Sequence, residues 1–168
     1  MTVWRLNSHP SDAARAARWF TRDSLVAIGW GDVGDMRCAL PETSSSIASM
    51  IRKVDPDSTD SQLGGQALWS FFRDMVVGDL VLVGDGSPGD PVMRIEGDYE
   101  WSSQVSPVAP GDYQHQRRAS LTTIDASELW ASCGRRVADG QDRRWRLARC
   151  TPAVTPVVAP VDGQPGVD

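Results

Sequence analysis

The residues best suited to chemistry in this chain are aromatic, and one of them stands where a predicted strand breaks into glycine. Residues 25–35 begin with Leu, Val and Ile, as a buried strand does, and end in three glycines and two aspartates. Glycine permits the positive φ values of tight turns. Trp30 lies between Gly29 and Gly31, so its indole face is open to a flat ligand. The alternative is a core tryptophan at a barrel end.

Tryptophan is abundant, with seven in 168 residues. Tyr99 and Trp101 follow a second predicted strand among acidic residues, and Trp69 lies off the apolar stripe of a predicted helix, at a groove edge or at the periphery of the core. Aromatic residues at strand ends are the usual platform for a nucleic-acid base, each stacking contact being worth roughly 1–3 kcal/mol. Two rings around one base could offset the cost of flipping it from a duplex. Three other tryptophans are predicted to be core residues: Trp4, Trp19 and Trp145.

Signatures of catalysis and of metal binding are mostly missing from the sequence. Residues 29–34 match Gly-x-Gly-x-x-Gly by spacing, but no helix is predicted to begin after them. The two histidines, His9 and His115, have no second ligand nearby, and the three cysteines lack metal-ligand spacing. We therefore expect a non-enzymatic binding domain with no cofactor and no metal.

The charge of the chain is unevenly distributed. The net charge of −5 argues against indiscriminate nucleic-acid binding, yet residues 115–150 hold eight of the 17 basic residues and only four of the 22 acidic ones. Such asymmetry indicates either a local polyanion-binding face or a solvated, arginine-rich pair of strands. If the two strands pair, one side of the barrel could carry basic side chains from this set: Arg117, Arg118, Arg144 and Arg146. Arg117 and Arg118 point to opposite faces if both lie in the strand, so only one of them can join, and we expect Arg117 to be the phosphate contact. By alternation, Trp145 and Leu147 should then face the core.

The elements that must position these residues are short and mixed. Strands are predicted at residues 2–6, 25–30, 80–83, 92–96, 113–123 and 143–150. Helices are predicted at residues 13–21, about 47–54, about 61–75 and 126–133. This order predicts an α+β fold: a small mixed β-barrel of five to six strands with two to three flanking helices.

Domain organisation and compartment follow from composition. Residues 1–150 are predicted to form one domain, and residues 151–168, with four prolines and no apolar period, a disordered tail. No apolar run approaches the roughly 18 residues of a membrane span, and no signal segment is recognisable. With an odd number of cysteines, the expected compartment is the reducing cytoplasm.

Six segments of the chain, taken in sequence order, resemble the EVE-like and YTH-like members of the PUA superfamily. The closest resemblance is to the modules fused to modification-dependent restriction enzymes of the McrBC and Mrr kinds. The segments cover most of residues 2–120 and are 4–8, 26–35, 68–75, 77–83, 95–101 and 113–118. The resemblance implies a PUA-like barrel that reads a flipped, methylated or hydroxymethylated base in DNA or RNA. It also implies a nuclease or GTPase partner encoded nearby.

The resemblance assigns roles to residues by position. Trp30 would form one wall of the base pocket, Tyr99 or Trp101 the opposing wall, and Asn7 and Ser8 would bind the base edge. We expect Trp30 to be partly exposed in a concavity, with Asn7 or Ser8 on the same rim. Contacts to phosphate are implied for four basic side chains: Arg73, His115, Arg117 and Arg118.

Two other functions stay open at this point. The acidic body favours a small ligand or a signalling nucleotide, because a small ligand needs no long basic track. A nuclease of the same superfamily is the other alternative, in which Asp98 or Glu100 acts on a phosphodiester beside Arg117.

Overall fold

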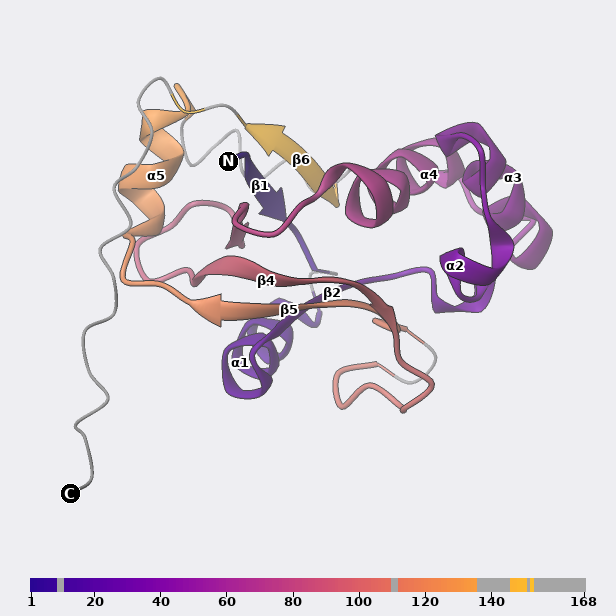
Figure 1. Cartoon of the computed structure of the whole chain (residues 1–168), viewed down its shortest axis with the longest axis horizontal. Helices are drawn as coiled ribbons and strands as arrows, with labels where there is room; N and C mark the ends of the chain where they lie inside the picture. Colours follow the sequence, from indigo (N-terminus) through magenta and orange to yellow (C-terminus); the bar gives the residue numbers. More distant parts are fainter. Residues whose placement is uncertain (9–10, 110–111, 136–145, 151, 153–168) are drawn as a thin grey trace.

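One mixed β-sheet runs through the molecule and carries helices at both ends (Figure 1). The computed structural model describes residues 1–8, 11–109, 112–135, 146–150 and 152. The strands are β1 (Val3–Leu6), β2 (Leu25–Ile28), β3 (Leu80–Val83), β4 (Val92–Trp101), β5 (His115–Leu121) and β6 (Leu147–Cys150). Their order in the sheet is β2-β5-β4-β3-β1-β6. β1 and β3 run parallel, and the other neighbours run antiparallel.

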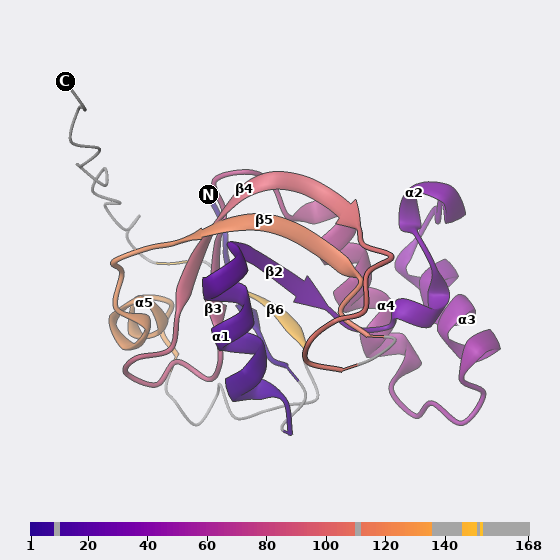
Figure 2. The same ribbon diagram turned by 90° about the horizontal axis from the view of Figure 1, so that it is seen from below.

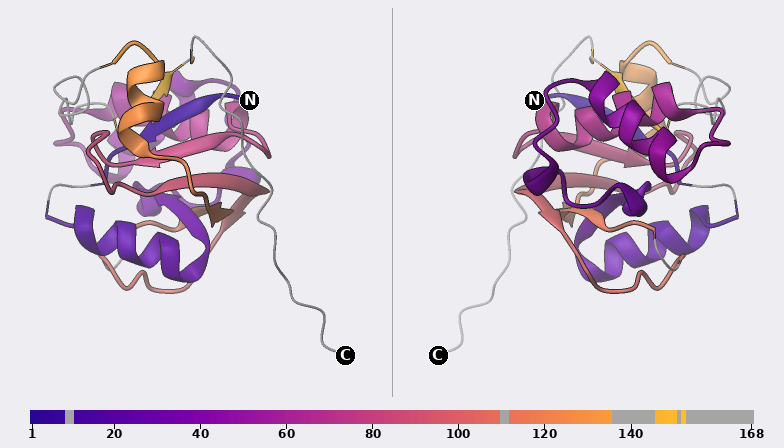
Figure 3. Two further views of the ribbon diagram at one scale, coloured as in Figure 1. Left: turned by 90° about the vertical axis from the view of Figure 1, so that its left-hand side faces the viewer. Right: turned by 90° about the vertical axis from the view of Figure 1, so that its right-hand side faces the viewer.

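The helices gather into three groups around this sheet. They are α1 (Ala13–Asp23), α2 (Met36–Ala39), α3 (Ser44–Val54), α4 (Ser61–Trp69) and α5 (Ala126–Ser132). Helix α1 lies across the part of the sheet that holds β2 and β5 (Figure 2). The α3–α4 pair lies at the opposite end of the molecule from α5 (Figures 1 and 3). The fold is therefore α+β with a six-stranded mixed sheet, and the described sheet is open, with β2 and β6 at its edges.

Side-chain alternation along β1 divides the core in two. Trp4 and Leu6 face the larger cluster, with residues of α1, α3 and α4, whereas Val3 faces a smaller cluster that includes Trp130 of α5. Successive residues of a strand point to opposite faces, so a four-residue strand can be buried on both sides. The core positions expected for Trp4, Trp19 and Leu147 are confirmed, since all three side chains are buried.

Several elements differ from the sequence-based expectation. Strand β4 continues to Trp101 rather than ending at residue 96, and a register irregularity between Ile95 and Tyr99 bends it. The helix expected at 61–75 is α-helical only to Trp69 and continues as a π-helix, Ser70–Asp74. The 3₁₀ turn Gly31–Val33 and helix α2 were not predicted.

Two expectations fall outside the described residues. The structure places β6 from Leu147, and residues 143–145, with Arg144 and Trp145, are not described. The same holds for the tail predicted at 151–168, of which Pro152 alone is described.

Two pairs of strand ends, one at each edge of the sheet, border one common space. β1 ends at Leu6 opposite the start of β6 at Leu147, and β2 ends at Ile28 opposite the start of β5 at His115. The backbone N–H of Asn7 donates to the carbonyl oxygen of Arg146 at 2.8 Å, which continues the first of these pairings. The segments that leave these strands therefore enclose a common space.

Candidate functional site

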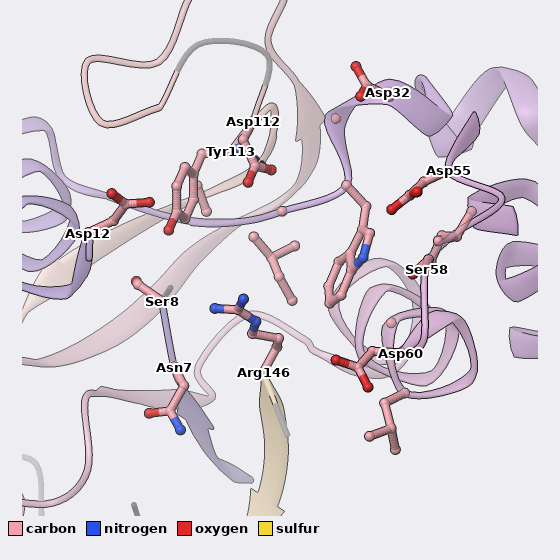
Figure 4. Close-up of a pocket in the computed structure, with 18 of the residues that line it drawn as sticks. Asn7, Ser8, Asp12, Asp32, Asp55, Ser58, Asp60, Asp112, Tyr113 and Arg146 are labelled. Atoms are coloured by element: carbon pink, nitrogen blue, oxygen red, sulfur yellow. Dashed lines mark hydrogen bonds between the residues drawn. The ribbon is translucent and has the colours of Figure 1, made fainter. Parts of the chain in front are cut away.

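A cavity of about 530 Å³ occupies that space (Figure 4). It is bordered by residues 6–8 after β1, by residues 27–32 at the end of β2, and by residues of α3, α4 and their connection. Asp12 before α1, Asp112 and Tyr113 before β5, and Arg146 before β6 complete the lining. Pockets of this volume accommodate small organic ligands.

Trp30 lies half-buried in this lining, in an unusual backbone conformation. Its φ is +66°, in the left-handed region that bulky residues rarely occupy. Helix α4 approaches the ring so closely that a Cβ at Gly64 would lie 2.8 Å from indole atoms Cε2 and Cζ2. Gly64 therefore lets α4 pack on Trp30. The expected geometry, a partly exposed Trp30 in a concavity shared with Asn7 and Ser8, is what the structure shows; its role in binding a base stays a prediction.

A buried hydrogen-bond chain holds the backbone of Trp30 in place. The carbonyl oxygen of Trp30 can only accept, so His115 Nε2–H donates to it at 3.1 Å. His115 Nδ1 then accepts from the hydroxyl of Tyr99 at 2.8 Å, and Tyr99 Oη accepts from the backbone N–H of Met36 at 3.2 Å. This tautomer is assigned from the network. His115 and Tyr99 thus position Trp30 from behind the cavity.

Burial sets the protonation states of His115 and Tyr99 in this hydrogen-bond chain. His115 is 0% exposed, and burial lowers its pKa to about 4, with weaker opposing effects from the Trp30 carbonyl and from Asp35. Burial also raises the pKa of Tyr99 to about 12. At neutral pH both side chains are uncharged, which suits a structural support and not a phosphate contact.

The two polar residues after β1 have different environments. Ser8 is only 7% exposed, borders the cavity, and its Oγ has no hydrogen-bond partner among the described residues. The amide of Asn7 is engaged instead: in the orientation that satisfies both groups, Nδ2 donates to the Gly84 carbonyl at 2.8 Å and Oδ1 accepts from Arg5 Nη1 at 2.5 Å. Of the predicted pair, Ser8 is the one with unused hydrogen-bonding capacity.

Carboxylates dominate the charge of the lining. Five aspartates and one arginine, Arg146, border the cavity; the aspartates are Asp12, Asp32, Asp55, Asp60 and Asp112. Figure 4 shows Asp55 and Asp60 on the α3–α4 side, with Asp12 and Asp112 across the cavity. This acidic lining was not anticipated from the sequence.

The aspartates differ in how far they are neutralised. Burial raises the pKa of Asp112, an effect partly offset by backbone N–H donors, including that of Tyr113 at 2.9 Å, and by the charge of Arg146. Asp12 forms an ion pair with Arg15 at 3.2 Å. Asp32, Asp55 and Asp60 are exposed, and within the described part of the chain their carboxylates make no hydrogen bond or ion pair.

Arg117 is buried, which does not fit its predicted contact to phosphate. It is 3% exposed, and its guanidinium donates to the carbonyl oxygens of Phe71 (2.8 Å), Phe72 (3.1 Å) and Gly97 (3.2 Å). Burial lowers its pKa, which the charges of nearby aspartates partly offset. A buried guanidinium held by three carbonyls is a structural clamp. His115, buried and neutral, is likewise removed from the predicted phosphate contacts.

The remaining predicted residues lie outside the cavity lining. Tyr99 is buried in the support described above, and Trp101 packs edge-on against His115, with ring centroids 5.0 Å apart. Arg73 packs over the rings of Trp69 and Phe72. Its guanidinium carbon lies 5.9 Å and 4.8 Å from the two ring centroids.

The expected basic face is not formed by the described residues. Arg118 is exposed and pairs with Glu100 at 3.4 Å, while its neighbour Arg117 points into the core. Arg146 lines the cavity. Arg73 and Arg118 are exposed, and their contacts to phosphate stay predictions.

Sequence reasoning missed four contributors to the lining. Asp55 and Asp60 lie in the connection between α3 and α4, where four aspartate or serine residues within six positions were a visible signal. Asp112 and Gly64 gave no such signal, because their importance depends on how β5 and α4 pack. Within the described residues, no group of three or more His, Cys, Asp or Glu side chains is arranged to hold a metal ion.

A protein-family model matches most of this chain. The model described as a domain of unknown function (DUF8426) matches residues 4–127. The chain belongs to the DUF8426 family. The matched span includes every cavity-lining segment except Arg146, so the cavity lies almost entirely within the DUF8426 domain. No curated protein has a sequence that matches this chain. Across the described residues, no helix is both long and apolar enough to cross a membrane.

Proposed function

We propose that the cavity beside Trp30 holds one flat heterocyclic base, and that the chain is a non-catalytic reader of a modified base flipped out of DNA or RNA. The observation that carries this proposal is the half-buried indole of Trp30 on a cavity of about 530 Å³. A base stacked on a tryptophan gains roughly 1–3 kcal/mol. That gain meets much of the few kcal/mol that unstacking a base costs.

Polar groups in the lining support recognition of a base edge. The Ser8 hydroxyl has no partner among the described residues, and Asp112 carries a carboxylate into a half-buried position. A carboxylate accepts hydrogen bonds from the exocyclic amino group of a base, and arginine donates to base or phosphate oxygens. Arg146 is the one arginine in the described lining that could do so.

Kinship with the EVE-like and YTH-like domains of the PUA superfamily is part of the same proposal. The mixed six-stranded sheet, with Trp30 at a strand exit, supports it. Under this proposal the sheet curves as a PUA-like barrel, the chain acts in the cytoplasm, and a nuclease or GTPase partner carries out any cleavage.

A free small ligand is the second candidate, favoured by the charge of the lining. Five carboxylates repel a phosphate backbone, and burial removes Arg117 and His115 from the predicted phosphate contacts. The same five carboxylates disfavour an anionic signalling nucleotide and favour an uncharged or cationic molecule.

Single-stranded oligonucleotides that carry one modified base, titrated by fluorescence polarisation, test the proposal. We expect the modified strand to bind more tightly than its unmodified counterpart, and Trp30→Ala to cost about 1–3 kcal/mol of binding. Trp69→Ala is the matched control, since Trp69 is also half-buried but lies outside the lining. Binding that survives Trp30→Ala and fails in Trp69→Ala would move the site away from this cavity.

A further inference from the structure

The cavity combines an aromatic face with an excess of carboxylates. Trp30 packs against Gly64 on α4, and the carbonyl of Asp60, one turn earlier, accepts the N–H of Gly64 at 2.8 Å. The carboxylates of Asp32, Asp55 and Asp60 are exposed at the rim and form no ion pair with a described residue. Unpaired negative charge therefore lies at the rim of the same cavity that holds the ring proposed to stack on the base.

An independent feature indicates that the cavity is built for a ligand. Ser8 is more than nine-tenths buried, borders the cavity, and leaves its hydroxyl without a hydrogen-bond partner among the described residues. Buried polar side chains are nearly always paired, because an unpaired one loses its hydration without compensation. A ligand in the cavity would supply the missing partner of Ser8 Oγ.

Charge and aromaticity together select a class of ligand. Tryptophan is the best aromatic partner for a cation, and the attraction grows when the cation leaves water. Carboxylates around a cleft raise the local concentration of cations. Asp12 is paired with Arg15, and Arg146 contributes one positive charge against the other four aspartates, so the lining keeps an excess of negative charge. A neutral ring would use the stacking face of Trp30 but not this charge.

Resting on the proposed base-reading function, we infer that the base is positively charged: a nucleobase methylated at a ring nitrogen. Methylation at N7 of guanine, N1 of adenine or N3 of cytosine gives the flat ring a delocalised positive charge. Trp30 then stacks on the cationic ring, Asp55 and Asp60 neutralise its charge from the α3–α4 side, and Ser8 hydrogen-bonds to its edge. Bases methylated on carbon or on the exocyclic amino group are neutral and gain only the stacking.

Isomeric nucleosides separate charge from shape. Titration calorimetry compares 1-methyladenosine with N6-methyladenosine, and 3-methylcytidine with 5-methylcytidine, at a pH where the first of each pair is charged. We expect each cationic isomer to bind about tenfold more tightly than its neutral isomer. Equal affinity within both pairs would overturn the charge inference and leave base reading intact. No binding of any nucleoside, alone or within an oligonucleotide, would overturn both.

Substitutions in the α3–α4 connection locate the effect. Asp55→Asn should weaken binding of 1-methyladenosine about threefold or more and leave N6-methyladenosine unchanged. Asp57→Asn is the matched control, because Asp57 is exposed in the same connection but does not line the cavity. Equal losses in the two variants would show a general field effect and overturn the assigned role of Asp55. Choline, a cation without a base, should bind far more weakly; choline affinity equal to that of 1-methyladenosine would overturn the assignment to a base.

Discussion

At the residue scale, Trp30 keeps a conformation that needs support from its surroundings. A bulky residue at positive φ costs of the order of 1–3 kcal/mol unless neighbouring contacts hold it. The His115–Tyr99–Met36 chain supplies one such contact at the carbonyl of Trp30, and Gly64 leaves room for the ring. Trp30 could be singled out from the sequence because glycines flank it. His115, interpreted from sequence as an exposed cation, could not be placed, because its burial depends on β2–β5 pairing.

The neutral state of His115 makes stability depend on pH. Its folded pKa of about 4 lies below the value of 6.5 for an unperturbed histidine. Its contribution is therefore complete above pH 6.5 and is lost as pH falls toward 4, because the unfolded chain binds the proton first. Urea unfolding should show the wild type losing about 2 kcal/mol more than His115→Gln between about pH 7 and about pH 4.5.

Comparing the wild type with His115→Gln controls for every other ionisable group. All other ionisable groups are common to both proteins, so the difference between the two pH profiles isolates His115. Parallel profiles would mean that His115 is accessible to protons in the folded state.

At the element scale, Arg117 joins three segments that the sequence alone could not bring together. It belongs to β5 and donates to two carbonyls of the π-helix Ser70–Asp74 and to one of β4. The carbonyls of Phe71 and Phe72 lie in the last turn of this helix, where carbonyls lack donors within the helix, and the guanidinium supplies donors for both. The periodicity of residues 61–75 predicted one helix, because side-chain pattern does not reveal where the backbone hydrogen bonding changes.

Replacing this clamp should destabilise the fold. Arg117→Met removes all three hydrogen bonds and leaves buried carbonyls unpaired, so we expect a loss of about 2–4 kcal/mol in the free energy of unfolding. Arg118→Met is the matched control: Arg118 is exposed and makes one ion pair with Glu100, and its loss should stay within about 0.5 kcal/mol. Chemical denaturation measures both variants, and losses of equal size would show that Arg117 is not a clamp.

At the scale of the whole molecule, sequence patterns predicted the α+β class and most element positions but not the charge of the site. Local patterns determine short strands and helices, and these were found near their predicted positions. The acidic lining assembles aspartates from four separate segments, and tertiary packing decides that these segments meet. The described residues do not form the predicted basic face for the same reason, since Arg117 turns inward and Arg146 lies in the cavity; Arg144 lies outside the described residues.

This charge distribution predicts a shallow salt dependence for nucleic-acid binding. Each phosphate contact lowers log K by about 0.7 per log unit of salt for a single strand. Of the four predicted phosphate residues, Arg73 and Arg118 are exposed, so the slope should be no steeper than about −1.5. Polarisation titrations between about 50 mM and about 200 mM salt give this slope. Arg73→Met should flatten it by about one contact; a slope several times steeper would reveal a basic track elsewhere.

The central claim, that the ligand stacks on Trp30, is tested most directly by the indole N–H resonances in a ¹⁵N-correlation NMR spectrum. The chain has seven such resonances, one for each tryptophan. The resonance that is missing from the spectrum of Trp30→Phe is that of Trp30. Titration with a single strand that carries a modified base should shift the Trp30 resonance and leave that of Trp130, which packs in the other core cluster beside α5, unchanged. Binding that shifts Trp69 or Trp101 while Trp30 stays in place would contradict the account.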